Sequence, residues 1–244
     1  MMHQNGRERL KLIYLIGTYP GLTTTFIDRE IRVMRQWGVD LQIMAIHQPA
    51  PTVSLSPEQV ALQQGTIYLL PAKVGLVILA HLYFALLRPF TYVGTFAYLA
   101  TRPHPSLKAR LKTIGHVGMA VYAAYLLRKQ AFHELHAHFV DRTATIALVV
   151  GRLLRKPYSL SIHAGADLYV EPVLLREKLG EARHAVTCTH FNQTHIEKLV
   201  GPEVVNKITH VRHGLELARY APPCCAGEDR HSQSKPLILS VGEL

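Results

Sequence analysis

Side chains that can bind metals or transfer protons are concentrated in HELHAHFVDR, residues 133–142. His136 and His138 are two residues apart, so both point to one face of a strand, and Asp141 follows just beyond it. Neutral imidazoles and a carboxylate suit zinc or manganese, so a metal-dependent hydrolase is one interpretation. No downstream cluster supplies obvious further ligands. The other interpretation is that His138 lines the carboxyl edge of a sheet, where doubly wound folds bind their ligands.

His163 is the candidate catalytic residue. It ends the predicted strand YSLSIH, residues 158–163, and small residues follow it in AGADLY, so a ligand can approach the backbone there. Asp167 could orient His163 or cap the next helix. A purely structural histidine is the alternative, because imidazole both donates and accepts hydrogen bonds.

A tight loop, GTYPG at residues 17–21, precedes a predicted helix, and helix N-termini bind phosphate readily. Gly17 and Thr18 are therefore candidate substrate-binding residues. The loop matches neither the dinucleotide fingerprint nor a P-loop, and an ordinary strand-to-helix turn remains the alternative.

The elements that position these residues alternate between strand and helix. The apolar run at residues 10–17 predicts a strand, the helical spacing of apolar residues at 25–38 predicts a helix, and residues 39–46 predict a second strand. Thr25 and Asp28 form a capping-box pattern, and Gly38 suits the left-handed C-terminal position.

The same alternation returns in the second half of the chain, with a helix predicted at residues 141–155. Further strands are predicted at residues 135–139, 158–163, 184–189 and 207–214. The fold class is therefore α/β, with a Rossmann-like, doubly wound parallel sheet.

Between the two halves, residues 74–130 form an apolar and then basic region. Arg88 and Pro89 divide its apolar part, residues 74–100, into pieces too short to span a bilayer. The interval between Arg102 and Lys129 carries basic residues and no acidic one. Helices that pack in the protein and helices that rest on an anionic bilayer surface both fit this pattern.

The net charge of +10 favours an anionic partner: nucleic acid, phospholipid or a phosphorylated small molecule. We expect no nucleic acid, because the basic residues adjoin aliphatic ones and form no aromatic stacking face. The three cysteines show no framework spacing, and the N-terminus lacks the apolar core of a secretory signal. A cytoplasmic protein is expected.

The C-terminal part changes composition. Residues 221–236 are rich in Pro, Gly, Ser and charge, which predicts an interdomain linker. Residues 237–244, LILSVGEL, predict the first strand of a second domain that the sequence does not contain, so residues 1–220 would form the first domain.

Taken in order, five segments resemble the N-terminal half of family 4 glycosyltransferases, and most of all the bacterial enzymes of colanic acid and other exopolysaccharide assembly. They are residues 16–46, 136–169, 175–196, 207–222 and 237–242. The resemblance implies one half of a GT-B architecture, in which two Rossmann-like domains face each other across a cleft. The N-terminal domain would hold the acceptor and the missing one a nucleotide sugar.

The resemblance also implies roles for single residues. Gly17 would lie near the donor phosphates, His163 would contact the transferred sugar, and His213 with Gly214 would lie at the hinge. Glu216 replaces the Asp of the family pattern, and Glu243 stands where the family has arginine.

The implied activity is retaining transfer of a hexose from a nucleotide sugar to a lipid-linked or polysaccharide acceptor, at the inner face of the cell membrane. No cofactor or metal is implied. The donor-binding residues are missing, so we expect little activity from this chain alone. The alternatives are a non-catalytic subunit that complements a separate donor-domain polypeptide, and the hydrolase of His136, His138 and Asp141.

Overall fold

The computed structural model describes residues 9–163, 165–170, 172–214 and 217, without the side chains of Ala166 and Asp167. The chain divides into two compact units, residues 1–213 and 214–244, and the sheet belongs to the first. The predicted linker at 221–236 and the predicted strand at 237–244 lie outside the described residues, as do Glu216 and Glu243.

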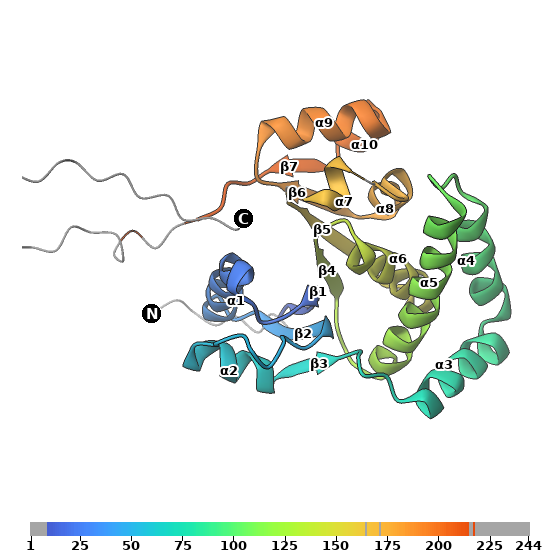
Figure 1. Cartoon of the computed structure of the whole chain (residues 1–244), viewed down its shortest axis with the longest axis horizontal. Coiled ribbons are helices and arrows are strands. Elements are labelled where there is room, and N and C mark those ends of the chain that lie inside the picture. The colour runs from blue at the N-terminus through green and yellow to red at the C-terminus, as the bar shows by residue number, and fades with distance from the viewer. Residues whose placement is uncertain (1–8, 164, 171, 215–216, 218–244) are drawn as a thin grey trace, which may run out of the picture. The chain divides into compact units, whose positions relative to one another are not determined.

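The described residues of the first unit form a seven-stranded parallel sheet with the order β3-β2-β1-β4-β5-β6-β7 (Figure 1). The strands are β1 Lys11–Thr18, β2 Asp40–His47, β3 Thr66–Tyr68, β4 Glu134–His138, β5 Tyr158–Ile162, β6 His184–Thr187 and β7 Ile208–His210. Every pairing is parallel. The predicted α/β, Rossmann-like fold is confirmed. The strand order changes direction between β1 and β4, and ligands bind at such a switch point in doubly wound folds.

Helices cover both faces of the sheet. The helical elements are η1 Leu22–Thr24, α1 Thr25–Gln36, α2 Pro57–Gln64, α3 Val74–Leu87, α4 Pro89–Thr101, α5 Leu107–Leu127, α6 Arg142–Leu154, α7 Ala166–Tyr169, α8 Leu175–Glu181, α9 His190–Val200 and α10 Pro202–Val205. In Figure 1, α1 and α2 lie on one side of the sheet, and α5 and α6 lie on the other.

Two apolar cores correspond to these two faces. The smaller core joins Tyr14, Ile16 and Ile43 of the sheet to Ile27 and Ile31 of α1. The larger core joins the opposite face of the same strands to α3, α5, α6 and α8. Alternation along the strands sends successive side chains to the two cores, which explains why strands covered on both faces read as continuous apolar runs.

The start of α1 differs from the prediction. Thr25 and Asp28 form no capping box; instead, Asp28 is buried and accepts hydrogen bonds from the Tyr19 hydroxyl at 2.7 Å and the Gln59 amide at 3.0 Å. A buried carboxylate needs such donors, and these tie the loop after β1 to α1 and α2. Gly38 has the predicted left-handed conformation, with φ of +83°.

The apolar region is divided at Arg88, as predicted. Helices α3 and α4 meet there at 111°, and the Arg88 guanidinium donates to the Leu153 carbonyl at 2.6 Å. Within the described ranges no single helix has the length and apolarity to cross a membrane, although α3 and α4 together pass that test as a bent pair. Leu86 and Phe90, on either side of the bend, are 77% and 92% exposed.

Candidate functional site

Four histidines from three strand ends converge at the carboxyl edge of the sheet. His136 and His138 lie on β4, His163 follows β5 and His213 follows β7. The ring centroids are 4.9 Å apart between His136 and His138, 5.8 Å between His138 and His163, and 5.3 Å between His163 and His213. The last two pairs are stacked, with interplanar angles of 10° and 15°. We call these four residues the histidine cluster.

Aromatic side chains enclose the histidine cluster on the α1 face of the sheet. The Tyr14 ring of β1 lies 5.1 Å from both His136 and His138. Phe26 of α1 lies 4.7 Å from His163 and 5.0 Å from His213. His136 and His138 therefore share one face of β4, as their spacing predicts. The switch point between β1 and β4 forms one wall of the site.

His136 is held by two serine hydroxyls of the neighbouring strand. Its Nδ1 lies 2.9 Å from Ser159 Oγ and its Nε2 lies 2.8 Å from Ser161 Oγ. Parallel register produces this geometry, because β4 and β5 align His136 with Ser159 and His138 with Ser161. Burial, with smaller contributions from His184 and His163, lowers the pKa of His136 to about 3. His136 is therefore neutral at physiological pH, with both ring nitrogens engaged.

His138 and His163 each keep an unused ring nitrogen. His138 is fully buried, and its Nδ1 lies 3.5 Å from His163 Nε2. Among the described residues, His138 Nε2, His163 Nδ1 and the nearby Arg29 Nε are buried without a hydrogen-bond partner. Buried polar atoms are rarely left unpaired, because each one costs about 1–3 kcal/mol. A polar ligand or a water molecule at this place would complete their hydrogen bonding.

The histidine cluster carries no net positive charge near neutral pH. Burial and then His213 lower the pKa of His163 to about 4, and burial, His136, His163 and His213 lower that of His138. Burial and then Arg29 also lower the pKa of His213. A neutral imidazole donates at one nitrogen and accepts at the other, so these rings suit the hydroxyl groups of an uncharged ligand.

A hydrogen-bonded pair, Tyr14 and Glu30, lies beside the histidine cluster. The Tyr14 hydroxyl donates to Glu30 Oε1 at 2.6 Å. Burial raises the pKa of Glu30, while the hydrogen bond from Tyr14 opposes that rise. The pair fixes α1 to β1 and orients the Tyr14 ring against the two histidines of β4.

The side chains could also hold a metal ion in two places. The potential ligand atoms of His163, Cys188 and His213 lie within 4.8 Å of one another, as do those of Glu30, His136 and His138. The first set resembles a zinc site in its donor types, with two imidazoles and a thiol. In the second set, both nitrogens of His136 already contact serine hydroxyls.

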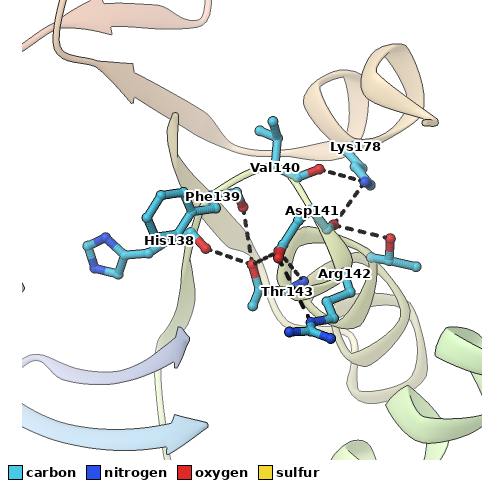
Figure 2. A network of polar contacts seen from close by, with 8 residues as sticks. His138, Phe139, Val140, Asp141, Arg142, Thr143 and Lys178 are labelled. Atoms are coloured by element: carbon cyan, nitrogen blue, oxygen red, sulfur yellow. Dashed lines mark hydrogen bonds and ion pairs between the residues drawn. The ribbon is translucent and has the colours of Figure 1, made fainter. Parts of the chain in front are cut away.

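Asp141 serves another purpose. It caps α6 by accepting from the Thr143 backbone N–H at 2.8 Å, and the Thr143 hydroxyl donates to the same oxygen at 2.8 Å (Figure 2). Its other oxygen lies 3.9 Å from Arg142 Nε. Neither of the two possible metal sets in the described residues contains Asp141, so the structure does not unite the predicted trio.

The remaining predicted site residues are spread along the chain. Gly17 is near α6, because a Cβ placed on it would lie 3.9 Å from Arg142 Nη2. Thr18 is exposed at the end of β1, and Gly214 is exposed just after His213. Asp167 belongs to α7, but its side chain lies outside the described residues. The structure therefore groups His138, His163 and His213.

Several residues of the site escaped the sequence analysis. Ser159 and Ser161 alternate on a predicted strand in the same way as the two histidines of β4, and this shared polar alternation was the available signal. Glu30 and Phe26 are four residues apart and hence share a face of α1. Cys188 gave no signal beyond its residue type.

Comparisons with known proteins support the fold. No protein-family model matches the chain, and no curated protein matches its sequence. A crystal structure of UDP-N-acetylglucosamine 2-epimerase aligns with a TM-score of 0.51 and 9% identity, over 83% of this chain and 48% of that one. The UDP-GlcNAc 2-epimerase from Methanocaldococcus jannaschii aligns with a TM-score of 0.45 and 12% identity, over 83% and 45%. This chain thus spans about half of each enzyme, and the first likeness supports the α/β, Rossmann-like fold.

Proposed function

We propose that this chain is the acceptor-side part of a family 4-like glycosyltransferase, which moves a sugar from a nucleotide sugar to a lipid-linked or polysaccharide acceptor. The observation that carries the proposal is the set of unpaired polar atoms on His138, His163 and Arg29, beside the switch point of a Rossmann-like sheet. The GT-B-type fold and the half-length match to a sugar-nucleotide enzyme support it.

In this proposal His163 contacts the transferred sugar. Its pKa near 4 keeps the imidazole neutral, so it can pair with a sugar hydroxyl without adding a charge beside the reacting carbon. Stacking against His138 and His213 holds the ring in place. The departing diphosphate would be stabilised by the donor-binding part of the enzyme, and no metal or other cofactor is required of this chain.

The test is turnover of a nucleotide sugar by this chain, with and without a polypeptide that supplies the donor-binding part. UDP-N-acetylglucosamine is a suitable first donor, because the enzyme of similar fold is named for it. Products are separated into glycosylated acceptor, epimerised donor and free sugar. Transfer to acceptor only when both polypeptides are present supports the proposal. Epimerised donor or free sugar as the sole product contradicts it.

Association with the inner face of the cell membrane is part of the proposal. Its support is the exposed apolar surface of α3 and α4, beside the basic N-terminal half of α5. Leu86→Glu with Phe90→Glu should abolish sedimentation with anionic vesicles, because a charge on this surface opposes contact with lipid. Leu22→Glu, at an exposed leucine before α1, is the control. Equal sedimentation of both variants would contradict membrane association.

Metal-dependent hydrolysis is the second candidate, favoured by the two groups of potential ligand atoms within 4.8 Å. Metal analysis of the purified chain separates the two proposals. Stoichiometric zinc or manganese that is lost in Cys188→Ala or Glu30→Gln would favour the hydrolase.

A further inference from the structure

A cavity of about 440 Å³ lies on the other side of the sheet from the histidine cluster. Its walls come from the N-terminal half of α5, the β4–α6 connection, the start of α6, the segment after α7, and α8. It shares no lining residue with the histidine cluster. Its volume falls in the range of small-ligand sites. We call it the cationic pocket.

Cations from three helices converge on the cationic pocket. Lys108 and Lys112 come from α5, Arg142 from α6 and Lys178 from α8. Among the lining residues that the structure describes, Asp141 is the single carboxylate, and it already caps α6 and lies beside Arg142. The described part of the lining therefore carries an excess of positive charge.

The cation on α8 is fixed in position. Lys178 is only 3% exposed, and its ammonium donates to the Val140 carbonyl at 2.6 Å and the Asp141 carbonyl at 2.9 Å (Figure 2). These bonds hold the charge at the cavity wall, where water screens it poorly. The cation is therefore preorganised to attract an anion.

His116 lines the cavity as well and responds to the same field. Burial is the main cause that lowers its pKa to about 4, and Lys112, Arg142 and Lys178 lower it further. A neutral imidazole can donate a hydrogen bond to an anion without requiring a further charge.

A phosphate suits these walls better than a carboxylate. A phosphate group carries up to two negative charges and three acceptor oxygens, and a diphosphate carries more, which matches cations on three separate helices. The cavity is larger than one phosphate, and Val140, Val170 and Val173 form an apolar part of its lining. The ligand therefore has a phosphate joined to a larger group.

We propose that the cationic pocket binds the phosphate or diphosphate group of the acceptor, separately from the sugar contacts of the histidine cluster. The identity of the molecule that carries the phosphate rests on the proposed function. Phosphate binding itself does not, because it follows from the charges and volume of the pocket. The same group could arrive on a membrane lipid or on a soluble molecule.

The first experiment measures binding of inorganic pyrophosphate to the full chain by calorimetry at constant ionic strength. Lys112→Gln should weaken binding about tenfold or more, because it removes a cation of the pocket. Arg110→Gln is the matched control: Arg110 is exposed on the same helix, loses the same charge and does not line the pocket. It should change the affinity less than about twofold, as a screened surface charge does. Equal weakening by both variants, or no binding to the unaltered chain, would overturn the proposal.

The second experiment separates the two sources of phosphate. Vesicles of phosphatidylcholine contain either phosphatidic acid, a phosphomonoester, or phosphatidylglycerol at matched surface charge. A preference for phosphatidic acid that Lys112→Gln removes and Arg110→Gln keeps supports a lipid-borne phosphate. Binding of pyrophosphate through Lys112 without that preference supports a soluble phosphate ligand.

Neither measurement uses sugar transfer. The chain could bind pyrophosphate through Lys112 and still fail the turnover test. That result would support the phosphate site and contradict only the proposed function. Sugar transfer by a chain that does not bind pyrophosphate would contradict only the proposed phosphate site.

Discussion

The histidine cluster and the cationic pocket lie near the same edge of one sheet but differ in charge. The histidine cluster faces α1, where burial keeps His136 and His163 neutral. The cationic pocket lies on the side of α5 and α6, where Lys112 and Arg142 line a cavity. Strands place short imidazoles in a closed layer, whereas helix surfaces place long cationic side chains near solvent. In the two proposals made above, one sheet edge contacts a neutral sugar through the histidine cluster and a phosphate through the cationic pocket.

The largest expected effect concerns the histidine cluster. His163→Ala should lower kcat/KM for sugar transfer by about 100-fold or more, because it would remove the proposed contact to the transferred sugar. Pyrophosphate binding should stay unchanged, since His163 does not line the cationic pocket. Rates are measured with the donor-binding polypeptide present. His190→Ala, at an exposed histidine of α9, is the control. Equal losses of kcat/KM in both variants would show that the histidine cluster has no specific role in sugar transfer.

The next prediction tests whether a cation of the cationic pocket also stabilises the folded protein. Lys178→Met should destabilise the protein by about 2–3 kcal/mol, because two buried carbonyl oxygens lose their donor. Lys108→Met removes an exposed cation of the same pocket and should change the free energy of unfolding by less than about 0.5 kcal/mol. Urea denaturation measures both. Equal stabilities would mean that Lys178 has no structural role.

Acid should destabilise the folded protein through the buried, neutral His136. The pKa of His136 falls to about 3 on folding, so the unfolded chain binds more protons than the folded one between pH 6.5 and 3. Stability is therefore lost as pH falls through that window, by about 1 kcal/mol per pH unit for this group. The raised pKa of Glu30 acts with the opposite sign, since it costs stability as pH rises above the ordinary range.

The contribution of His136 can be isolated from the other groups. His136→Asn should flatten the dependence of the unfolding free energy on pH between 4 and 6.5, because it removes the group whose pKa falls on folding. Denaturation at several pH values measures the slopes. Identical slopes in His136→Asn and the unaltered chain would show that the pKa of His136 does not change on folding.

The smallest effect concerns the pair that supports the histidine cluster. Tyr14→Phe should destabilise the protein by about 1 kcal/mol, because Glu30 loses the hydrogen bond from the hydroxyl. The pKa of Glu30 should rise further, since that bond holds it down. Titration of the carboxyl by NMR checks the direction. A fall in the pKa of Glu30 would contradict the described pair.

Much of the fold was predictable because its elements follow local rules. Apolar runs predicted six of the seven strands in the described sheet, and the Arg88–Pro89 pair predicted the break between α3 and α4. The edge strand β3, Thr66–Tyr68, has only three residues and left no recognisable pattern. The candidate site was predictable only in part. The shared face of His136 and His138 follows from a two-residue period, but their serine partners depend on the register of another strand.

The sequence by itself determined where strands and helices form, where Gly38 ends a helix and which residues could do chemistry, because these properties depend on neighbours a few residues away. The tertiary structure alone decided that Asp141 caps α6, that His213 stacks on His163 and that four cations surround one cavity. It also decided which histidines are neutral. Burial and long-range register set these outcomes, and both arise from residues that are distant in the chain and meet only in the folded state.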